Sequence, residues 1–187
     1  MSPLEEAVHE VARLLESRRV PYMVIGGVAN LVWGVPRSTG DVDVTLWVEE
    51  EAREGFVRDV ASELEVLVED PVAFVERTRV LPARTRSGFR ADLVFGLLAY
   101  EKEAIDRARP VEFAGLRVRI CTAEDLVLHK LASERARDRE DVRGILETQG
   151  ARLDRGYLDR RVEALSRDLD RPDILEFYRR VVRARSR

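Results

Sequence analysis

Apolar residues recur along this chain with two periods, one typical of helices and one typical of strands. Near the start, Leu4, Val8, Val11 and Leu15 lie three or four positions apart, which predicts an amphipathic helix that ends before Pro21. Later runs rich in β-branched and apolar residues, each bounded by turn formers, predict strands. The strands expected in this way cover residues 22–25, 41–48, 64–68, 80–86, 89–95, 111–113 and 116–120.

Helices alternate with these strands in the first two-thirds of the chain and then continue alone. The helices expected in the first part cover residues 28–33, 50–63 and a short stretch that begins near residues 70–71. From Thr122 onward the pattern is helical throughout, Gly150 can end one helix, and Pro172 can begin the last. We therefore expect an α/β (α+β) fold, with a mixed sheet and its helices in residues 1–121 and a helical subdomain in residues 122–187.

The composition narrows the class of protein. With 187 residues, of which 45% are hydrophobic, the chain can bury a core and is not disordered. It has no run of about 18 apolar residues, so no membrane span is expected. The single cysteine, Cys121, cannot form an internal disulfide, and the acidic start with Glu5 and Glu6 does not resemble a signal peptide. We therefore expect a cytoplasmic protein.

The charges are unevenly distributed. The only lysines among the 32 basic residues are Lys102 and Lys130, and the net charge is −3. Residues 151–187 nevertheless carry eleven arginines against seven acidic residues, with Arg179, Arg180, Arg183 and Arg185 close together at the end. This basic section would suit a polyanionic acceptor such as RNA. The alternative is a solvated, arginine-rich helix face.

Two aspartates separated by a single residue lie at the start of the second expected strand. Side chains alternate along a strand, so Asp41 and Asp43 project from one face, with Cα atoms about 7 Å apart. Carboxylates this close repel each other unless a cation lies between them, and hard divalent cations prefer such ligands. The pair therefore predicts a site for Mg²⁺, or for Mn²⁺.

A glycine pair precedes the short helix that leads to these aspartates. Without side chains, Gly26 and Gly27 allow backbone N–H groups to approach an anion closely, and a helix N-terminus favours a phosphate. A phosphate cradle and a metal clamp within twenty residues indicate a nucleotide phosphate held against Mg²⁺.

This combination resembles the signature of the nucleotidyltransferases of the DNA polymerase β superfamily. The signature is a Gly-Gly or Gly-Ser turn, a helix, and an Arg and a Ser or Thr shortly before Asp-x-Asp. Its positions are filled here by Gly26, Gly27, Arg37, Thr39, Asp41 and Asp43. The resemblance implies a small palm domain with a C-terminal helical subdomain and Mg²⁺-dependent transfer of a nucleoside monophosphate. It also implies that the glycines, Arg37 and Thr39 bind the nucleotide and that the two aspartates are catalytic metal ligands. The alternative is a solvated turn and an edge strand.

The family's third carboxylate normally lies on a strand next to the Asp-x-Asp strand, and the best candidate is Asp92. An aspartate within a run of strand formers is costly if it is buried without a partner, and a metal ion would remove that cost. On this interpretation Asp92 is a metal ligand and catalytic base. The alternative places it on the solvated face of an edge strand. Asp70 and Asp106 are the other contenders, but both lie at predicted helix ends or on helix surfaces.

A second block, residues 129–141, lies in the helical part. It resembles the Lys-x-x-Ala, Arg-Asp-x-x-Asp motif of a subset of these transferases that includes the AbiE-type abortive-infection toxins and minimal nucleotidyltransferase-like proteins. The resemblance implies that Lys130 contacts the triphosphate from the cleft edge, where a flexible ammonium suits a point contact. Asp138 would orient Lys130 or the acceptor, and Asp141 would pair with an arginine. The alternative is a salt-bridged helical hairpin.

Three functions fit the sequence. The first is a transferase that moves a nucleoside monophosphate from a nucleoside triphosphate to a hydroxyl of tRNA or a protein, as the toxin partner of an antitoxin protein. The second is an antibiotic-type transferase for small molecules, and the third is an inactive nucleotide-binding module. Asp41, Asp43 and Asp92 count against the third, because their retention serves catalysis. No membrane partner is expected.

Overall fold

The computed structural model describes residues 1–185, with side chains for residues 1–184. The chain divides into two compact units. The first comprises residues 1–28 and 38–121, and the second comprises residues 29–37 and 122–187. The sequence indicated a division after residue 121, but it did not indicate that residues 29–37 group with the helical unit.

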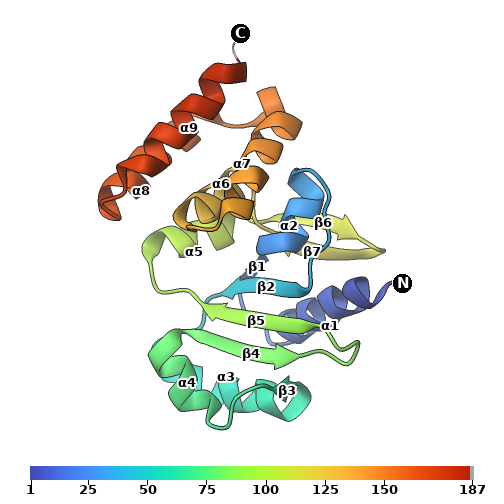
Figure 1. The fold of residues 1–187 in the computed structure, drawn as a ribbon. Helices are drawn as coiled ribbons and strands as arrows, with labels where there is room; N and C mark the ends of the chain where they lie inside the picture. The colour runs from blue at the N-terminus through green and yellow to red at the C-terminus, as the bar shows by residue number, and fades with distance from the viewer. Residues whose placement is uncertain (186–187) are drawn as a thin grey trace. The chain divides into compact units, whose positions relative to one another are not determined.

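The first unit is built on one seven-stranded mixed sheet (Figure 1), in the order β3-β4-β5-β2-β1-β7-β6. Its strands are β1 (Tyr22–Val24), β2 (Asp41–Leu46), β3 (Glu65–Val66), β4 (Val80–Arg84), β5 (Arg90–Phe95), β6 (Arg109–Phe113) and β7 (Leu116–Ile120). The pairs β2–β5 and β1–β7 are parallel, and the remaining pairs are antiparallel. The antiparallel pairs β4–β5 and β6–β7 are formed by strands that the sequence predicts.

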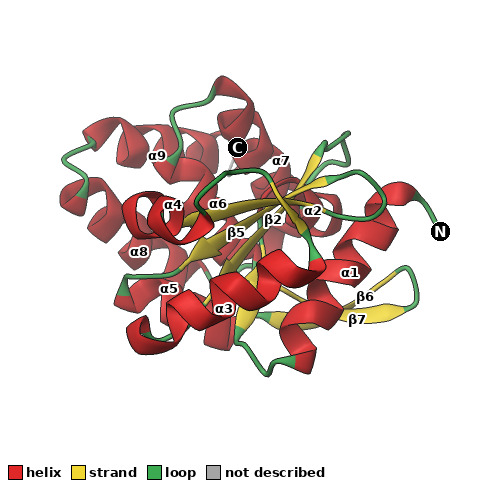
Figure 2. Cartoon of the chain, turned by 90° about the horizontal axis from the view of Figure 1, so that it is seen from below, coloured by secondary structure: helices red, strands yellow, loops and turns green. Residues whose placement is uncertain are grey.

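Helices of the first unit accompany this sheet (Figure 2). They are α1 (Pro3–Ser17), α3 (Glu50–Glu63), α4 (Pro71–Thr78) and α5 (Ala99–Arg107). The helix α1 begins with a reciprocal capping box between Ser2 and Glu5, and its apolar stripe, including Val8, Val11 and Leu15, is buried. The amphipathic pattern therefore predicts this helix and the face that packs.

The second unit is helical. It contains α6 (Ala123–Ala132), α7 (Ala136–Gln149), a short 3₁₀ turn (Gly150–Arg152), α8 (Arg155–Asp168) and α9 (Pro172–Arg185). Thr122 caps α6 by accepting a hydrogen bond from the Asp125 N–H, and Gly150 ends α7 with a positive φ of 53°. The helix α2 (Gly26–Trp33) begins in the first unit and ends in the second.

The observed elements confirm a mixed α/β fold with a helical C-terminal section. None of the described helices is both long and apolar enough to cross a membrane.

Candidate active site

The register between β2 and β5 brings three carboxylates onto one face of the sheet. The two strands are parallel neighbours, and Asp43 lies directly opposite Asp92. The residues next to the aspartates, such as Val42 and Leu93, are completely buried, while all three aspartates are partly exposed. Because side chains alternate along each strand, Asp41, Asp43 and Asp92 share the face that the apolar residues do not. The competing candidates lie elsewhere: Asp70 caps α4, and Asp106 is exposed on α5.

The first glycine of the pair is packed against one of these carboxylates. Gly26 has a φ of +63°, which favours glycine, and a Cβ atom at this position would lie 2.0 Å from the Asp43 Oδ2 atom. The Ile25 N–H also donates a backbone hydrogen bond of 2.9 Å to the Asp43 carbonyl. Both the backbone conformation and the space at position 26 therefore require glycine, and the start of α2 lies in contact with the metal-ligand candidate.

The second glycine is packed against the hydroxyl-bearing loop. A Cβ atom on Gly27 would lie 2.1 Å from the Thr39 Oγ1 atom. That hydroxyl donates a hydrogen bond of 3.0 Å to the Asp41 Oδ1 atom. Thr39 therefore connects the glycine turn to the first aspartate, and the residues predicted for the first unit lie together: both glycines, Thr39 and the three carboxylates.

Arg90 is a charged residue of this face that the sequence did not single out. Its Nε–H donates a hydrogen bond of 2.9 Å to the Asp92 Oδ1 atom. The hydrogen bond to Asp92 and the charge of that carboxylate raise the pKa of Arg90, with further contributions from Asp41 and Asp43. A guanidinium therefore lies in the field of all three carboxylates. Its position two residues before Asp92, hence on the same face, is the signal that could have identified it.

The donor set on this face fits a hard divalent cation. It consists of carboxylate oxygens, the ligands that Mg²⁺ and Mn²⁺ prefer. Among residues 1–185, no three His, Cys, Asp or Glu side chains are gathered closely enough to form a complete metal cluster. Proteins usually bind Mg²⁺ through one or two carboxylates together with substrate phosphates and water. A group of carboxylates that needs the oxygens of a nucleotide to complete the coordination therefore suits this ion.

The second unit holds the remaining predicted residues in a buried ionic network. Lys130 is buried, with 6% of its surface exposed, whereas the sequence suggested a surface lysine at the edge of a cleft. Its ammonium lies 2.6 Å from the Asp138 Oδ1 atom and 2.8 Å from the Asp141 Oδ2 atom. Lys130 is therefore paired with Asp138, as it would be both if Asp138 orients this lysine and in a salt-bridged helical hairpin. Contact of Lys130 with a triphosphate stays a prediction.

Arg37 joins the same network from the loop that follows α2. Its Nε–H and Nη2–H groups donate hydrogen bonds of 2.8 Å and 2.7 Å to the two oxygens of Asp141. The sequence expected an arginine partner for Asp141 but did not identify it, because the two residues lie 104 positions apart. This bidentate pairing fixes both the position and the plane of the guanidinium.

The two carboxylates of this network are held in their charged form. Burial alone would raise the pKa of Asp141, but hydrogen bonds from Arg37 and Lys130 and the charges of both outweigh burial and lower it. The pKa of Asp138 is lowered in the same way, since burial is outweighed by hydrogen bonds from Lys130 and Ser133 and by nearby charges. Asp138 and Asp141 are therefore both ionised at neutral pH.

The arginines of α9 differ in their surroundings. Arg179 forms an ion pair of 2.8 Å with Glu163 of α8, and Arg180 lies 5.8 Å from the centre of the Phe177 ring. Arg183 is exposed, and the side chain of Arg185 lies outside the described residues. Within the described part of α9, the predicted basic surface therefore consists of the exposed Arg180 and Arg183, together with Arg179, which is paired with Glu163.

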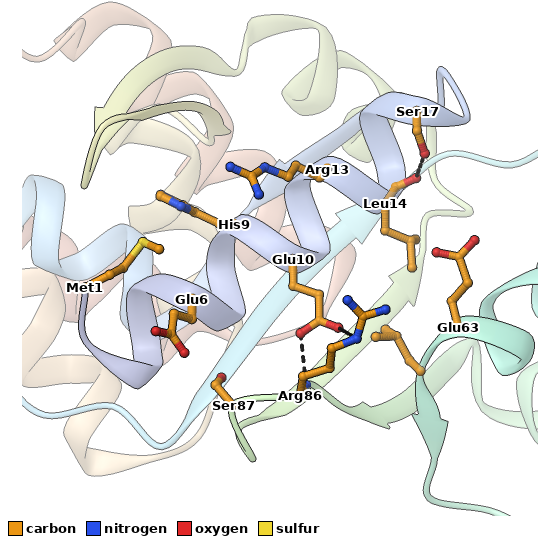
Figure 3. Close-up of a pocket in the computed structure, with 11 residues that line it drawn as sticks. Met1, Glu6, His9, Glu10, Arg13, Leu14, Ser17, Glu63, Arg86 and Ser87 are labelled. Atoms are coloured by element: carbon orange, nitrogen blue, oxygen red, sulfur yellow. Dashed lines mark hydrogen bonds and ion pairs between the residues drawn. The ribbon is translucent and has the colours of Figure 1, made fainter.

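A separate hollow of about 530 Å³ lies beside α1 in the first unit (Figure 3). Glu10 reaches across it to Arg86, whose backbone N–H and side chain both approach the Glu10 carboxylate. None of the predicted catalytic or nucleotide-binding residues lines this hollow. It is therefore distinct from the carboxylate face.

The comparison with protein families decides the class of the chain. The model of the family described as "Nucleotidyltransferase of unknown function (DUF6036)" matches residues 2–170. The chain belongs to this family. This membership confirms the resemblance to nucleotidyltransferases that the first motif indicated.

Solved structures with this nucleotidyltransferase fold cover most of the chain. ANT(2")-Ia in complex with adenylyl-2"-tobramycin is 19% identical, with a TM-score of 0.57, and the match covers 95% of this chain and 99% of that one. An antigenic nucleotidyltransferase-like protein from Paracoccidioides brasiliensis is 18% identical, with a TM-score of 0.55 and coverages of 94% and 91%. The lincomycin-bound lincosamide antibiotic adenylyltransferase LnuA is 14% identical, with a TM-score of 0.51 and coverages of 78% and 96%. At these identities the likeness shows the fold. No curated protein matches the chain in sequence.

Proposed function

We propose that this protein is an active, Mg²⁺-dependent nucleotidyltransferase that moves a nucleoside monophosphate from a nucleoside triphosphate to a hydroxyl acceptor. The observation that carries the proposal is the packing of Gly26 against Asp43, directly opposite Asp92. This packing places the glycine turn, which we propose binds phosphate, beside the carboxylates that we propose bind the metal. Nucleotidyl transfer requires these two parts to lie next to each other. An inactive nucleotide-binding module would have no need of three carboxylates on one face.

In the proposed reaction, the acceptor oxygen forms a bond to the α-phosphorus while the bond from that phosphorus to the bridging oxygen breaks, and pyrophosphate leaves. Asp92 takes the proton of the acceptor hydroxyl. Asp41, Asp43 and Asp92 would hold Mg²⁺, which supplies electrostatic stabilisation of the attacking and leaving oxygens. The backbone N–H groups at Gly26 and Gly27 bind the β- and γ-phosphate oxygens.

Residues outside the carboxylate face complete the proposed nucleotide site. Thr39, which already contacts Asp41, and Arg37 bind phosphate oxygens. Lys130 neutralises charge on the triphosphate, and Asp138 orients it through their 2.6 Å contact. The single cysteine, Cys121, is buried and free of disulfides, and a reaction that consumes nucleoside triphosphates suits the cytoplasm.

Two acceptor classes remain as candidates. A tRNA or protein acceptor, with the protein acting as the toxin of a toxin–antitoxin pair, is supported by the second block and by the exposed arginines of α9. A small-molecule acceptor is supported by the structural match to ANT(2")-Ia, whose structure holds adenylyl-2"-tobramycin. The match covers 95% of this chain and 99% of that one, so the two chains have the same extent.

The test is incubation of the purified protein with each α-labelled nucleoside triphosphate and Mg²⁺, in separate reactions with total RNA, a protein extract or an aminoglycoside. We expect one class of acceptor to become labelled, and the Asp43→Asn variant to label none. If no triphosphate labels any acceptor and none binds, the proposed function is wrong. The acceptor that carries the label decides between the two classes.

A further inference from the structure

The loop between α2 and β2 is held from one side by the helix α7. The Gln149 side chain donates a hydrogen bond of 2.6 Å to the Trp33 carbonyl at the end of α2. Five residues earlier on α7, Gly144 allows Val35 to approach so closely that an added Cβ atom would lie 3.0 Å from the Val35 Cγ2 atom. One further turn back, Asp141 receives the bidentate hydrogen bonds of Arg37. The helix α7 therefore contacts the last residue of α2 and two alternate residues of the loop that follows it.

Among the three α7 residues that make these contacts, Asp141 is the charged one, and other charged side chains of the unit hold it in place. Its side chain is 5% exposed, and its Oδ2 atom accepts both from Arg37 and from the ammonium of Lys130, which lies 2.8 Å away. Lys130 in turn is paired with Asp138, whose side chain is 4% exposed. Arg135, whose side chain is exposed, also pairs with Asp138 at 2.9 Å, so three cations surround the two buried carboxylates. Removal of Asp141 would therefore leave the buried Lys130 with one carboxylate partner fewer.

Both oxygens of Asp141 are engaged within this network, so its contribution to the reaction would pass through Arg37. Arg37 lies four residues before Asp41 and two before Thr39 in the chain. A shift of the Arg37 backbone would therefore also displace Thr39 and Asp41, because all three residues belong to one short segment. Thr39 is proposed to contact the nucleotide, and Asp41 the metal.

We propose that Asp141 is a positioning residue for nucleotidyl transfer: held by Lys130 and Asp138, it fixes the guanidinium of Arg37 and with it the loop that delivers Thr39 and Asp41. The inference rests on the proposed function and adds to it a residue that does not touch the substrate. It also gives Lys130 a role through Asp141, in addition to the proposed contact with the triphosphate.

The test compares Asp141→Asn with Asp125→Asn. Asp125 is a matched control because it is a buried aspartate of the same unit, with 1% exposure, and it accepts hydrogen bonds from Thr122 and Tyr157 rather than from the loop. The first measurement is hydrogen exchange of the backbone amides of residues 34–40 without nucleotide. We expect Asp141→Asn to exchange at least about tenfold faster than the parent in this loop, and Asp125→Asn to leave the loop unchanged.

The second measurement is kcat/KM for the nucleoside triphosphate, together with the Kd of a non-hydrolysable analogue. We expect Asp141→Asn to lower kcat/KM by about 10²-fold, as small misplacements of a catalytic constellation do. In an Arg37→Gln background the same substitution should cost nothing further, because its effect passes through Arg37. A general structural defect would instead add to the Arg37→Gln loss.

Arg37→Lys keeps the proposal testable if Asp141→Asn fails to fold, since Arg37 is less buried and lysine keeps the charge without the bidentate fork. Faster loop exchange in that variant supports the proposal. Unchanged loop exchange, or full additivity with Arg37→Gln, overturns it. If the parent protein neither binds nor transfers a nucleotide while loop exchange responds as expected, the proposed function fails and the holding of the loop by Asp141 stands.

Discussion

Gly26 and Asp43 approach each other so closely that no side chain fits between them: a Cβ atom on residue 26 would lie 2.0 Å from the Asp43 carboxylate oxygen. The glycine belongs to the start of α2 and the aspartate to β2, so the contact joins the two halves of the motif. Position 26 therefore holds glycine for two separate reasons, which are its positive φ and the contact with Asp43.

Replacement of Gly26 by alanine separates these two reasons. Gly115 is a matched control, because its φ of +84° is also positive but nothing lies within 4 Å of an added Cβ atom. We expect both Gly26→Ala and Gly115→Ala to cost about 1 kcal/mol or more of unfolding free energy from backbone strain. Only Gly26→Ala should also abolish transfer, because it displaces Asp43. Unfolding in urea and an initial-rate assay check this, and a fully active Gly26→Ala variant would contradict it.

Metal binding should depend on Asp43. Mg²⁺ or Mn²⁺ should raise the Tm of the parent protein, and more so with a nucleoside triphosphate, because a ligand that binds only the folded state stabilises it. Asp43→Asn should remove this increase and retain the fold, as checked by circular dichroism. Asp106→Asn, an exposed aspartate of α5, should keep the full increase. A metal response that survives in Asp43→Asn would place the ion elsewhere.

Lys130 and Lys102 offer a contrast between a buried and an exposed lysine. Lys130→Ala should lower the free energy of unfolding by about 3 kcal/mol, the lower end for a broken buried ion pair, because Asp138 and Asp141 each keep an arginine partner. Lys102, which lies 5.0 Å from the centre of the Trp47 ring, should contribute less than about 1 kcal/mol.

The same pair tests the proposed triphosphate contact. Measured below its Tm, Lys130→Ala should lose about 10²-fold in transfer rate, as expected when a preorganised charge at a transferring phosphate is removed. Lys102→Ala should retain the parent rate. Parent activity in folded Lys130→Ala would leave this lysine with a structural role alone.

The network should also make stability depend on acid pH. Asp138 and Asp141 have pKa values lowered from 3.8 by their cationic partners, so their ion pairs contribute their full stability above the unfolded pKa. This contribution should be lost as the pH falls below about 3.8 through the lowered folded values. Urea unfolding between pH 2 and pH 6 measures it. The Asp138→Asn variant should lose less stability over this range than the parent, and an equal loss would show that other carboxylates dominate.

The binding of a polyanionic acceptor such as RNA should depend on the exposed arginines of α9. Replacement of Arg180 and Arg183 by glutamine should weaken RNA binding and flatten its salt dependence, since fewer phosphate contacts release fewer counterions. The same changes at Arg58 and Arg77, exposed residues of the first unit, provide the control. Equal RNA binding by both double variants, measured at several salt concentrations, would leave α9 as a solvated face.

The sequence by itself determined most of the elements and the first motif, although it did not predict the helix α5. The helical period of α1 and the β-branched run of β2 depend on which side chains face a core, and such periods are visible without coordinates. The glycine pair and the spacing of Asp41 and Asp43 also lie within twenty residues, so local geometry alone relates them. For the same reason the helix ends at Thr122, Gly150 and Pro172 could be predicted from capping residues.

Only the tertiary structure decided which distant residues became partners. The parallel pairing that sets Asp43 opposite Asp92 depends on a register between strands separated by more than forty residues, and no local pattern fixes it. Lys130 looked like a surface residue because a lone lysine is costly to bury. Its burial is possible because Asp138 and Asp141 compensate its charge, and Arg37 completes the balance from 104 positions away. The environment of a charged side chain is set by its partners, and those partners are chosen by the fold.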